Sequence, residues 1–202
     1  MIGIIDYGAG NLFSVKNALD YLGVENCVTG DREEIEKADG LILPGVGAFP
    51  DAMEMLEKKG LAEVISREAL KKPLLGICLG MQLLFEKSCE FKETKGLGLI
   101  PGQVIQIDAK GLKIPHMGWN DLQVLNHCAM TEDMEKNPYV YFVHSYYLKA
   151  KDPKIVKATA EYGVTIHASV EKGSVFGCQF HPEKSGGTGL HNLKNFIERQ
   201  GE

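Results

Sequence analysis

Residues 74–80 read Leu-Leu-Gly-Ile-Cys-Leu-Gly, and this stretch decides the fold. Its apolar start is typical of a buried strand, and apolar residues at helical spacing follow from position 79 to position 85. Residues 2–5 and 41–43 are similar apolar runs, each followed by a Gly-bearing turn and then by apolar residues at helical spacing. Because parallel strands need crossover helices, this alternation predicts a parallel sheet covered by helices on both faces.

The second half of the chain has a different texture. After about residue 95, short segments rich in β-branched and aromatic residues predict antiparallel strands in or beside the sheet, at 104–107, 139–143, 154–159 and 175–180. Helical spacing over 190–197 predicts a closing helix, whose start is left open by the glycine-rich residues 186–189. Since no repeat, linker or low-complexity segment is present, residues 1–202 are predicted to form a single α/β domain. It has a mostly parallel central sheet flanked by helices, with antiparallel strands added in the C-terminal half.

Composition narrows the class of protein. The chain has 202 residues, of which 44% are hydrophobic and 24% charged, as in ordinary globular proteins. The net charge of −5 carries no block of like charges, which argues against nucleic-acid and membrane-surface partners. No apolar run reaches a membrane span and the start lacks the basic region of a signal peptide, so we expect a cytoplasmic protein. The five cysteines include no C-x-x-C pair, which argues against a disulfide framework or a zinc ribbon.

The strand-to-helix junction has the glycine spacing of a nucleophile elbow. Residues 76–80 match the G-x-S-x-G pattern of hydrolases, with Cys78 in place of serine. A helix N-terminus is electropositive and favours a thiolate, and the amide of Leu79 would point toward a developing oxyanion. We therefore predict that Cys78 is a nucleophile. Without this context, a buried cysteine acting as a small hydrophobic residue would be the better interpretation.

A base is expected from the segment that follows the last predicted strand. His181 and Glu183 flank Pro182, which restricts the backbone so that the carboxylate can orient the imidazole ring. With Cys78 they would form a triad of nucleophile, base and orienting group. Taken alone, His181 would be interpreted as a surface or structural histidine and Glu183 as a solvated charge.

A glycine-rich turn follows the strand predicted at 41–43. Gly45, Val46 and Gly47 would lie at the carboxyl edge of the sheet, where sites in open α/β folds gather. Their backbone N–H groups could stabilise an oxyanion, by roughly 3 kcal/mol for a good donor. The alternative is a plain turn built from proline and glycine.

These motifs together resemble the class I (triad) glutamine amidotransferases, whose elbow looks like residues 76–82 and whose second motif looks like residues 181–183. Residues 6–11, 113–120 and 141–146 extend the likeness nearly end to end. They are similar to the glutaminase subunits of imidazole glycerol phosphate synthases.

The resemblance implies hydrolysis of L-glutamine to glutamate and ammonia without a cofactor or metal. The ammonia would pass to a separate TIM-barrel cyclase subunit in a heterodimer of histidine biosynthesis. It also implies an oxyanion turn that becomes productive only when the cyclase binds its substrate, through reorientation of a peptide near Val46. Residues with implied substrate roles are Gln82, Ser145 and Tyr146, and residues implied to face the partner are Asn11, Met117 and Trp119.

Several alternatives stay open on the sequence. A dinucleotide site at Gly8 and Gly10 lacks its third glycine, since Phe13 stands there, and a turn with Asn11 as helix cap is the simpler interpretation. The spacing of the candidate metal ligands Cys178, His181, His127 and Cys128 fits no zinc pattern.

Three alternatives to the amidotransferase function also remain open. The fold also supports hydrolases that act without a partner, non-enzymatic redox or binding modules, and paralogues that supply ammonia to another synthase. A lone tryptophan such as Trp119 is also common in protein cores.

Overall fold

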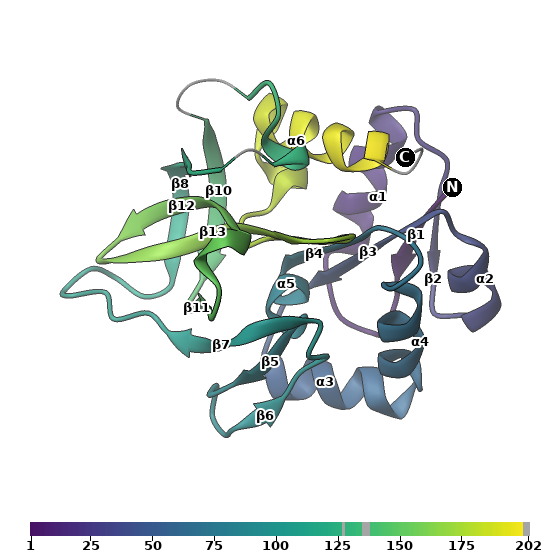
Figure 1. The fold of residues 1–202 in the computed structure, drawn as a ribbon, viewed down its shortest axis with the longest axis horizontal. Helices are drawn as coiled ribbons and strands as arrows, with labels where there is room; N and C mark the ends of the chain where they lie inside the picture. The colour runs from purple at the N-terminus through teal and green to yellow at the C-terminus, as the bar shows by residue number, and fades with distance from the viewer. Residues whose placement is uncertain (127, 135–137, 200–202) are drawn as a thin grey trace.

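The computed structural model describes residues 1–126, 128–134 and 138–199, and its centre is an eight-stranded sheet (Figure 1). The strand order is β2-β1-β3-β4-β14-β13-β12-β9. The ladders from β2 to β14 are parallel, and those from β14 to β9 are antiparallel. The strands are β1 (Ile2–Ile5), β2 (Asn26–Thr29), β3 (Gly40–Gly45), β4 (Leu74–Cys78), β9 (Gln123–Val124), β12 (Val156–Tyr162), β13 (Val164–Lys172) and β14 (Val175–Cys178). The predicted fold class is confirmed.

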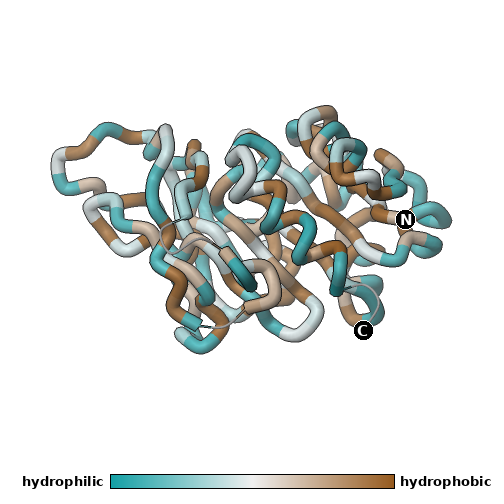
Figure 2. The backbone as a smooth tube through the Cα atoms, turned by 90° about the horizontal axis from the view of Figure 1, so that it is seen from above, coloured by the Kyte–Doolittle hydropathy of each residue, from teal (hydrophilic) through white to brown (hydrophobic). Residues whose placement is uncertain are grey.

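Helices cover both faces of this sheet. They are α1 (Leu12–Tyr21), α2 (Arg32–Lys37), α3 (Phe49–Lys58), α4 (Leu61–Glu68), α5 (Leu79–Leu83) and α6 (Gly186–Glu198). In Figure 1, α1 and α6 lie above the central strands and α3 and α4 below them. Successive strand residues alternate between the faces, so that Ile4 packs in the core cluster of α1 and α6 while Ile5 packs in that of α3 and α4. Figure 2 shows the resulting pattern, with apolar positions along the inner strands and hydrophilic positions in the outer loops.

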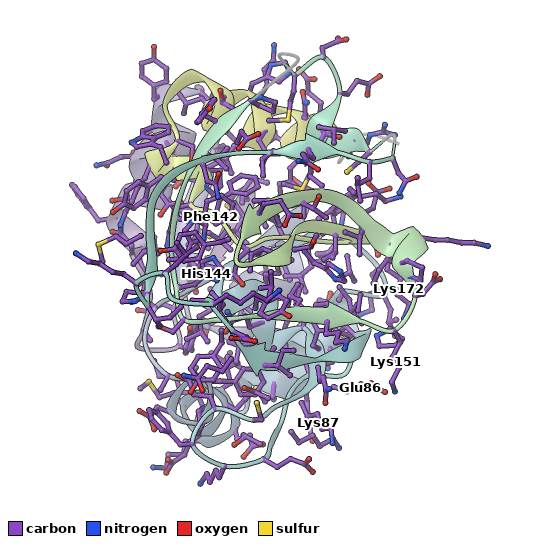
Figure 3. The ribbon with its side chains drawn as sticks, turned by 90° about the vertical axis from the view of Figure 1, so that its left-hand side faces the viewer. Glu86, Lys87, Phe142, His144, Lys151 and Lys172 are labelled. Atoms are coloured by element: carbon purple, nitrogen blue, oxygen red, sulfur yellow. The ribbon has the colours of Figure 1, made fainter. Side chains whose placement is uncertain are left out.

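Two small sheets lie beside the large one. The first pairs β8 (His116–Asp121) with β10 (Tyr139–His144), and the second has the order β11-β7-β5-β6. The strands of the second are β5 (Phe85–Ser88), β6 (Thr94–Lys95), β7 (Ile100–Gln106) and β11 (Tyr146–Ala150). Figure 3 looks onto these sheets and shows Glu86 near Lys151, with which it forms an ion pair of 2.7 Å. Within the described residues, no helix combines the length and apolar character needed to cross a membrane.

Several element boundaries differ from the sequence prediction. The helix predicted to reach residue 85 ends at Leu83, because Phe85 starts a strand that pairs with β7. Residues Pro153–Ile155 form a 3-10 turn (η2) before β12, and β14 ends at Cys178. The glycine-rich segment forms the first turn of α6, where a Cβ on Gly189 would lie 1.9 Å from the Pro182 carbonyl oxygen. The edge strand β2 and helix α2 were not predicted, since β2 is only partly buried and shows no clean alternation.

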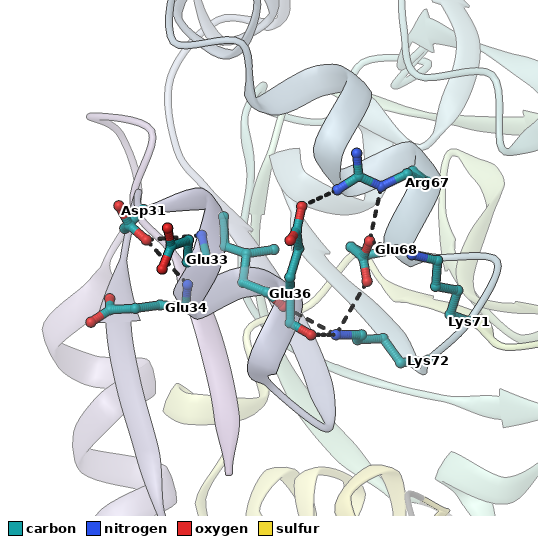
Figure 4. Close-up of polar contacts among 9 residues, drawn as sticks. Asp31, Glu33, Glu34, Glu36, Arg67, Glu68, Lys71 and Lys72 are labelled. Carbon is teal, nitrogen blue, oxygen red and sulfur yellow. Dashed lines mark hydrogen bonds and ion pairs between the residues drawn. The ribbon is translucent and has the colours of Figure 1, made fainter.

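A polar cluster fixes α2 against α4 (Figure 4). Glu68 has only 2% of its side chain exposed and pairs with Arg67 at 3.0 Å, Lys71 at 2.8 Å and Lys72 at 3.3 Å. Lys72 also donates to the backbone carbonyl of Glu36 at 2.7 Å. Hydrogen bonding to Lys71 is the main cause that lowers the pKa of Glu68 to about 2. The carboxylate is therefore compensated although it is buried.

Candidate active site

Cys78 lies at a sharp turn between β4 and α5. Its backbone has φ 54° and ψ −112°, a conformation rarely adopted by residues other than glycine. The flanking glycines allow this turn to pack closely. A Cβ on Gly80 would lie 1.8 Å from the Leu43 carbonyl oxygen, and one on Gly76 would lie 2.6 Å from the Cα of Met81. The geometry is that of a nucleophile elbow.

The strands on either side of β4 bring the other predicted residues to the elbow. On one side, Gly45 of β3 pairs in register with Cys78. On the other side, Cys178 of β14 pairs with Ile77, and the chain then leads directly to His181. All three segments meet at the carboxyl edge of the parallel strands, the usual location of sites in open α/β sheets.

His181 and Glu183 form a buried pair beside the thiol. The Nδ1 atom of His181 lies 2.8 Å from Oε1 of Glu183, and the two side chains are 2% and 1% exposed. Burial alone would lower the pKa of His181, but its interactions with Cys78 and Glu183 outweigh burial and raise the pKa to about 10. Since Glu183 occupies Nδ1, the Nε2 atom remains for proton exchange, and it makes no hydrogen bond of its own.

A cavity of about 320 Å³ opens above the thiol. It is lined by eight residues predicted for the site, Val46, Gly47, Cys78, Leu79, Gln82, Ser145, Tyr146 and His181. The two remaining predicted residues lie behind its wall, since Gly45 lies beside Cys78 and Glu183 backs His181. The cavity is also lined by residues for which no site role was predicted, namely Glu90, Pro115, Val143 and His144.

Comparison with known proteins assigns the family. The family model described as "Glutamine amidotransferase class-I" matches residues 3–199. Imidazole glycerol phosphate synthase subunit HisH of Caldanaerobacter subterraneus subsp. tengcongensis is 54% identical over 199 residues, covering 98% of each chain. The subunit of the same name from Bacillus cereus is 53% identical over 197 residues, covering 97% of this chain and 93% of that one. The chain is a class I glutamine amidotransferase of the HisH family.

Solved structures agree on the fold of the amidotransferase. A crystal structure titled as a glutamine amidotransferase has a TM-score of 0.78 at 23% identity, covering 100% of this chain and 99% of that chain. The structure of PurLQS from Thermotoga maritima contains a chain with a TM-score of 0.77 at 22% identity, covering 98% of this chain and 97% of that one. At such identities the likeness concerns the fold alone.

Gln82 has a different arrangement from the one expected of a direct substrate ligand. Its Nε2 donates to the carbonyl oxygen of Tyr146 and to Oε1 of Gln179, both at 3.0 Å. Both amide hydrogens are therefore used within the protein, and only the carbonyl oxygen of Gln82 remains to accept a hydrogen bond from a ligand. Gln179, which is fully buried, in turn places its Nε2 3.7 Å from the Cys78 sulfur.

Glu90 supplies an acidic group to the cavity of the amidotransferase. Its Oε2 accepts from the backbone N–H of Phe49 at 2.7 Å, and the residue is only 8% exposed. Burial raises the pKa of Glu90, while the Phe49 amide partly opposes this effect. The residues around Glu90 show no motif, so its place in the site follows only from the tertiary structure.

The residues predicted to face a partner lie outside the cavity. Met117 and Trp119 on β8 are 62% and 56% exposed, so the core alternative for Trp119 is wrong. Asn11 caps helix α1, with Oδ1 accepting from the N–H of Ser14 at 3.4 Å. This cap agrees with the simpler interpretation of the turn at Gly8 and Gly10.

The metal alternative gains no support from the part of the chain that is described. Within that part, no group of three His, Cys, Asp or Glu side chains could hold a metal ion. His127, one of the candidate ligands, lies outside the described residues.

Proposed function

We propose that this chain is the glutaminase subunit of an imidazole glycerol phosphate synthase. It would hydrolyse L-glutamine to glutamate and ammonia, and the ammonia would pass to a TIM-barrel cyclase subunit in a heterodimer of histidine biosynthesis. The observation that carries the proposal is an elbow cysteine that opens into one cavity with a histidine paired to a buried glutamate. The identity to HisH proteins over nearly the whole chain supports the choice of synthase.

Substrate binding uses the polar groups of the cavity. The carboxylate of Glu90 is placed to pair with the α-ammonium group of glutamine. Ser145 and Tyr146 form the wall beside it, and the carbonyl oxygen of Gln82 accepts a hydrogen bond from the substrate. These contacts orient the side-chain amide over Cys78.

The first half of the reaction forms a thioester. The Cys78 thiolate attacks the amide carbon, and the N–H of Leu79 together with the turn of Gly45, Val46 and Gly47 stabilises the oxyanion. Protonated His181 transfers a proton from Nε2 to the amide nitrogen, the C–N bond breaks, and ammonia leaves. The raised pKa of His181 suits this role, because the ring then carries the proton that it transfers.

The second half restores the enzyme. Neutral His181 removes a proton from a water molecule that attacks the thioester carbonyl. The C–S bond then breaks, glutamate leaves, and the thiolate and imidazolium are restored. Glu183 keeps the ring oriented and stabilises its charge throughout.

The partner would dock on Met117 and Trp119, the exposed apolar side chains of β8. By its resemblance to the family, Asn11 would also face the partner. Residues 1–202 would act as one amidotransferase domain. The five free cysteines, with a thiol as nucleophile, fit a reducing compartment, and we place the reaction in the cytoplasm.

The test is glutamine hydrolysis by the purified chain, alone and with a cyclase subunit plus an analogue of the cyclase's nucleotide substrate. We expect strong stimulation by the partner, loss of activity in Cys78→Ala, and retention in the matched control Cys178→Ala. High activity without a partner would indicate an autonomous hydrolase. Activity that no histidine-pathway cyclase stimulates would indicate a paralogous synthase.

A further inference from the structure

Two histidines lie opposite each other on the strand pair that forms the wall between the cavity and the exposed face of β8. His116 on β8 pairs in register with His144 on β10. The residues are 3% and 6% exposed, and the His116 ring is stacked between Phe142 at 4.7 Å and Tyr162 at 4.0 Å. Figure 3 shows Phe142 and His144 one above the other in this part of the molecule. His144 lines the cavity, yet the triad chemistry does not use it.

The ring nitrogens of both histidines belong to one continuous hydrogen-bond chain. The Nδ2 atom of Asn120 lies 3.3 Å from Nε2 of His116. The Nδ1 atom of His116 lies 2.9 Å from Nε2 of His144. The Nδ1 atom of His144 lies 2.8 Å from the carbonyl oxygen of Tyr146.

The carbonyl group at the end of this hydrogen-bond chain fixes the tautomers of the His116 and His144 rings. A carbonyl oxygen only accepts, so Nδ1 of His144 carries the hydrogen. Burial lowers the pKa of His144 to about 3 and that of His116 to about 4, so both rings are neutral at pH 7. Nε2 of His144 is then an acceptor, which requires the hydrogen of His116 on Nδ1 and leaves its Nε2 to accept from Asn120. All donors therefore point from β8 toward the cavity.

The carbonyl group of Tyr146 connects this series of hydrogen bonds to Cys78. It accepts a second hydrogen bond from Gln82, whose other amide hydrogen goes to Gln179, and Gln179 approaches the sulfur of Cys78. With both lone pairs of the Tyr146 carbonyl occupied, its peptide group has a single supported orientation. The segment 145–146, which forms one wall of the cavity, is thereby held by the side chains of His144 and Gln82.

We propose that His116 and His144 are positioning residues of the glutaminase, a neutral pair with fixed tautomers that holds the Tyr146 carbonyl in place and so shapes the wall that binds glutamine. This inference rests on the proposed function. It also gives β8 a double role, because the strand carries His116 on its buried face and Met117 and Trp119 among its exposed residues. If a docked partner displaced β8, the hydrogen bonds from His116 to His144 and from His144 to the Tyr146 carbonyl would transmit the displacement to the wall that binds glutamine.

The first test observes the tautomers in the isolated chain and does not depend on activity. Two-bond ¹⁵N–¹H correlation spectra distinguish an imidazole protonated on Nδ1 from one protonated on Nε2. At pH 7, His116 and His144 should both carry the hydrogen on Nδ1, and the variants His116→Phe and His144→Asn assign the signals. A hydrogen on Nε2 of either ring, or a charged ring, would overturn the proposal even if the chain hydrolyses glutamine.

The second test compares two substitutions of similar size that differ in the donor. The amide nitrogen of asparagine takes the position of Nδ1, so His144→Asn keeps a donor for the Tyr146 carbonyl, whereas His144→Leu removes it. We expect His144→Leu to raise the KM for glutamine at least about tenfold with kcat within about threefold, an effect of about 1.4 kcal/mol. His144→Asn should restore most of the KM.

The outcomes separate the two proposals. Equal KM values for His144→Asn and His144→Leu, in variants whose melting temperatures agree, would refute the positioning role while leaving the glutaminase assignment intact. Absence of partner-stimulated hydrolysis in the unsubstituted chain would refute the proposed function, and the tautomers would still decide the state of the histidine pair.

Discussion

Replacement of Glu183 by glutamine separates the charge of the proposed triad from its shape. Oε1 of Glu183 lies 2.8 Å from Nδ1 of His181, while its Oε2 is buried and makes no hydrogen bond. Glutamine can keep an oxygen at the first position and place its amide at the second, so the ring orientation is preserved. What is lost is the charge that helps to raise the pKa of His181 to about 10.

The size of the effect follows from this geometry. A charge-assisted hydrogen bond is roughly twice as strong as a neutral one, so the imidazolium should lose about 1–2 kcal/mol of stabilisation, equivalent to about one pKa unit. Because the proposed mechanism uses the imidazolium in both halves of the reaction, the slower half is affected whichever it is, and we expect kcat to fall about 5- to 30-fold. KM for glutamine should stay within about threefold, since Glu183 does not line the cavity.

The assay is steady-state glutamine hydrolysis by the complex across pH, with alkylation of Cys78 by iodoacetamide as a second readout. Removing the charge lowers the pKa of His181, so the limb of the pH profile that reports loss of the imidazolium should move to lower pH. Glu57→Gln, a change at an exposed position of α3, is the control and should behave like the unsubstituted chain. A Glu183→Gln enzyme with unchanged kcat and an unmoved pH limb would refute the assignment of Glu183 as the orienting group.

Three further predictions concern the framework of the site. Gly80→Ala should destabilise the fold by about 3 kcal/mol or more in chemical denaturation, because the added Cβ would clash with backbone atoms. Gly187→Ala, in the first turn of α6 where a Cβ has open space, should stabilise the fold by about 0.5–1 kcal/mol. Equal effects of the two substitutions would contradict the packing argument. Glu68→Gln should cost about 1–3 kcal/mol in the same assay, since its three cationic partners lose a buried carboxylate, and a cost near zero would show that the cluster contributes nothing. Below pH 6.5, His116 and His144 become protonated in the unfolded chain, whereas in the folded chain they stay neutral down to about pH 4 and about pH 3. The free energy of unfolding should therefore fall with decreasing pH by up to about 1.4 kcal/mol per pH unit for each ring. His144→Asn should reduce this slope, and an unchanged slope would show that His144 is not a buried neutral histidine.

The parts of the site that the sequence predicted are those whose geometry is local. The elbow around Cys78 needs its two glycines wherever the sheet lies, and the two-residue spacing of His181 and Glu183 allows their pairing within one short turn. Apolar runs that alternate with helices also predicted the parallel pairing of the central strands, although not their order and not the edge strand β2. Local rules therefore place the chemistry at one edge of the sheet.

The parts that the sequence did not predict depend on pairing between distant segments. Glu90 lies in the cavity with its carboxylate bonded to the distant Phe49 amide, and His144 meets His116 because β10 pairs with β8. The amide of Gln82 points inward because Gln179 and the Tyr146 carbonyl lie within its reach. Gln82, His116 and His144 lie in the motif segments 76–82, 113–120 and 141–146, but neither a motif nor a periodicity records which side chains meet across the fold.

The strained backbone of Cys78 depends on contacts with distant segments, and this explains why those contacts matter for the reaction. Cys78 has a backbone conformation that costs of order 1–3 kcal/mol for a non-glycine residue, so it persists only where the surroundings over-determine it. Close packing of Gly80 against β3 supplies support from one side, and the Gln82–Gln179 pair supplies it from the other. The sulfur is thus held by elements that also shape the substrate wall. A change to the Gln82–Gln179 pair should therefore alter thiol reactivity as well as glutamine binding, whereas a change confined to the far helices should alter neither.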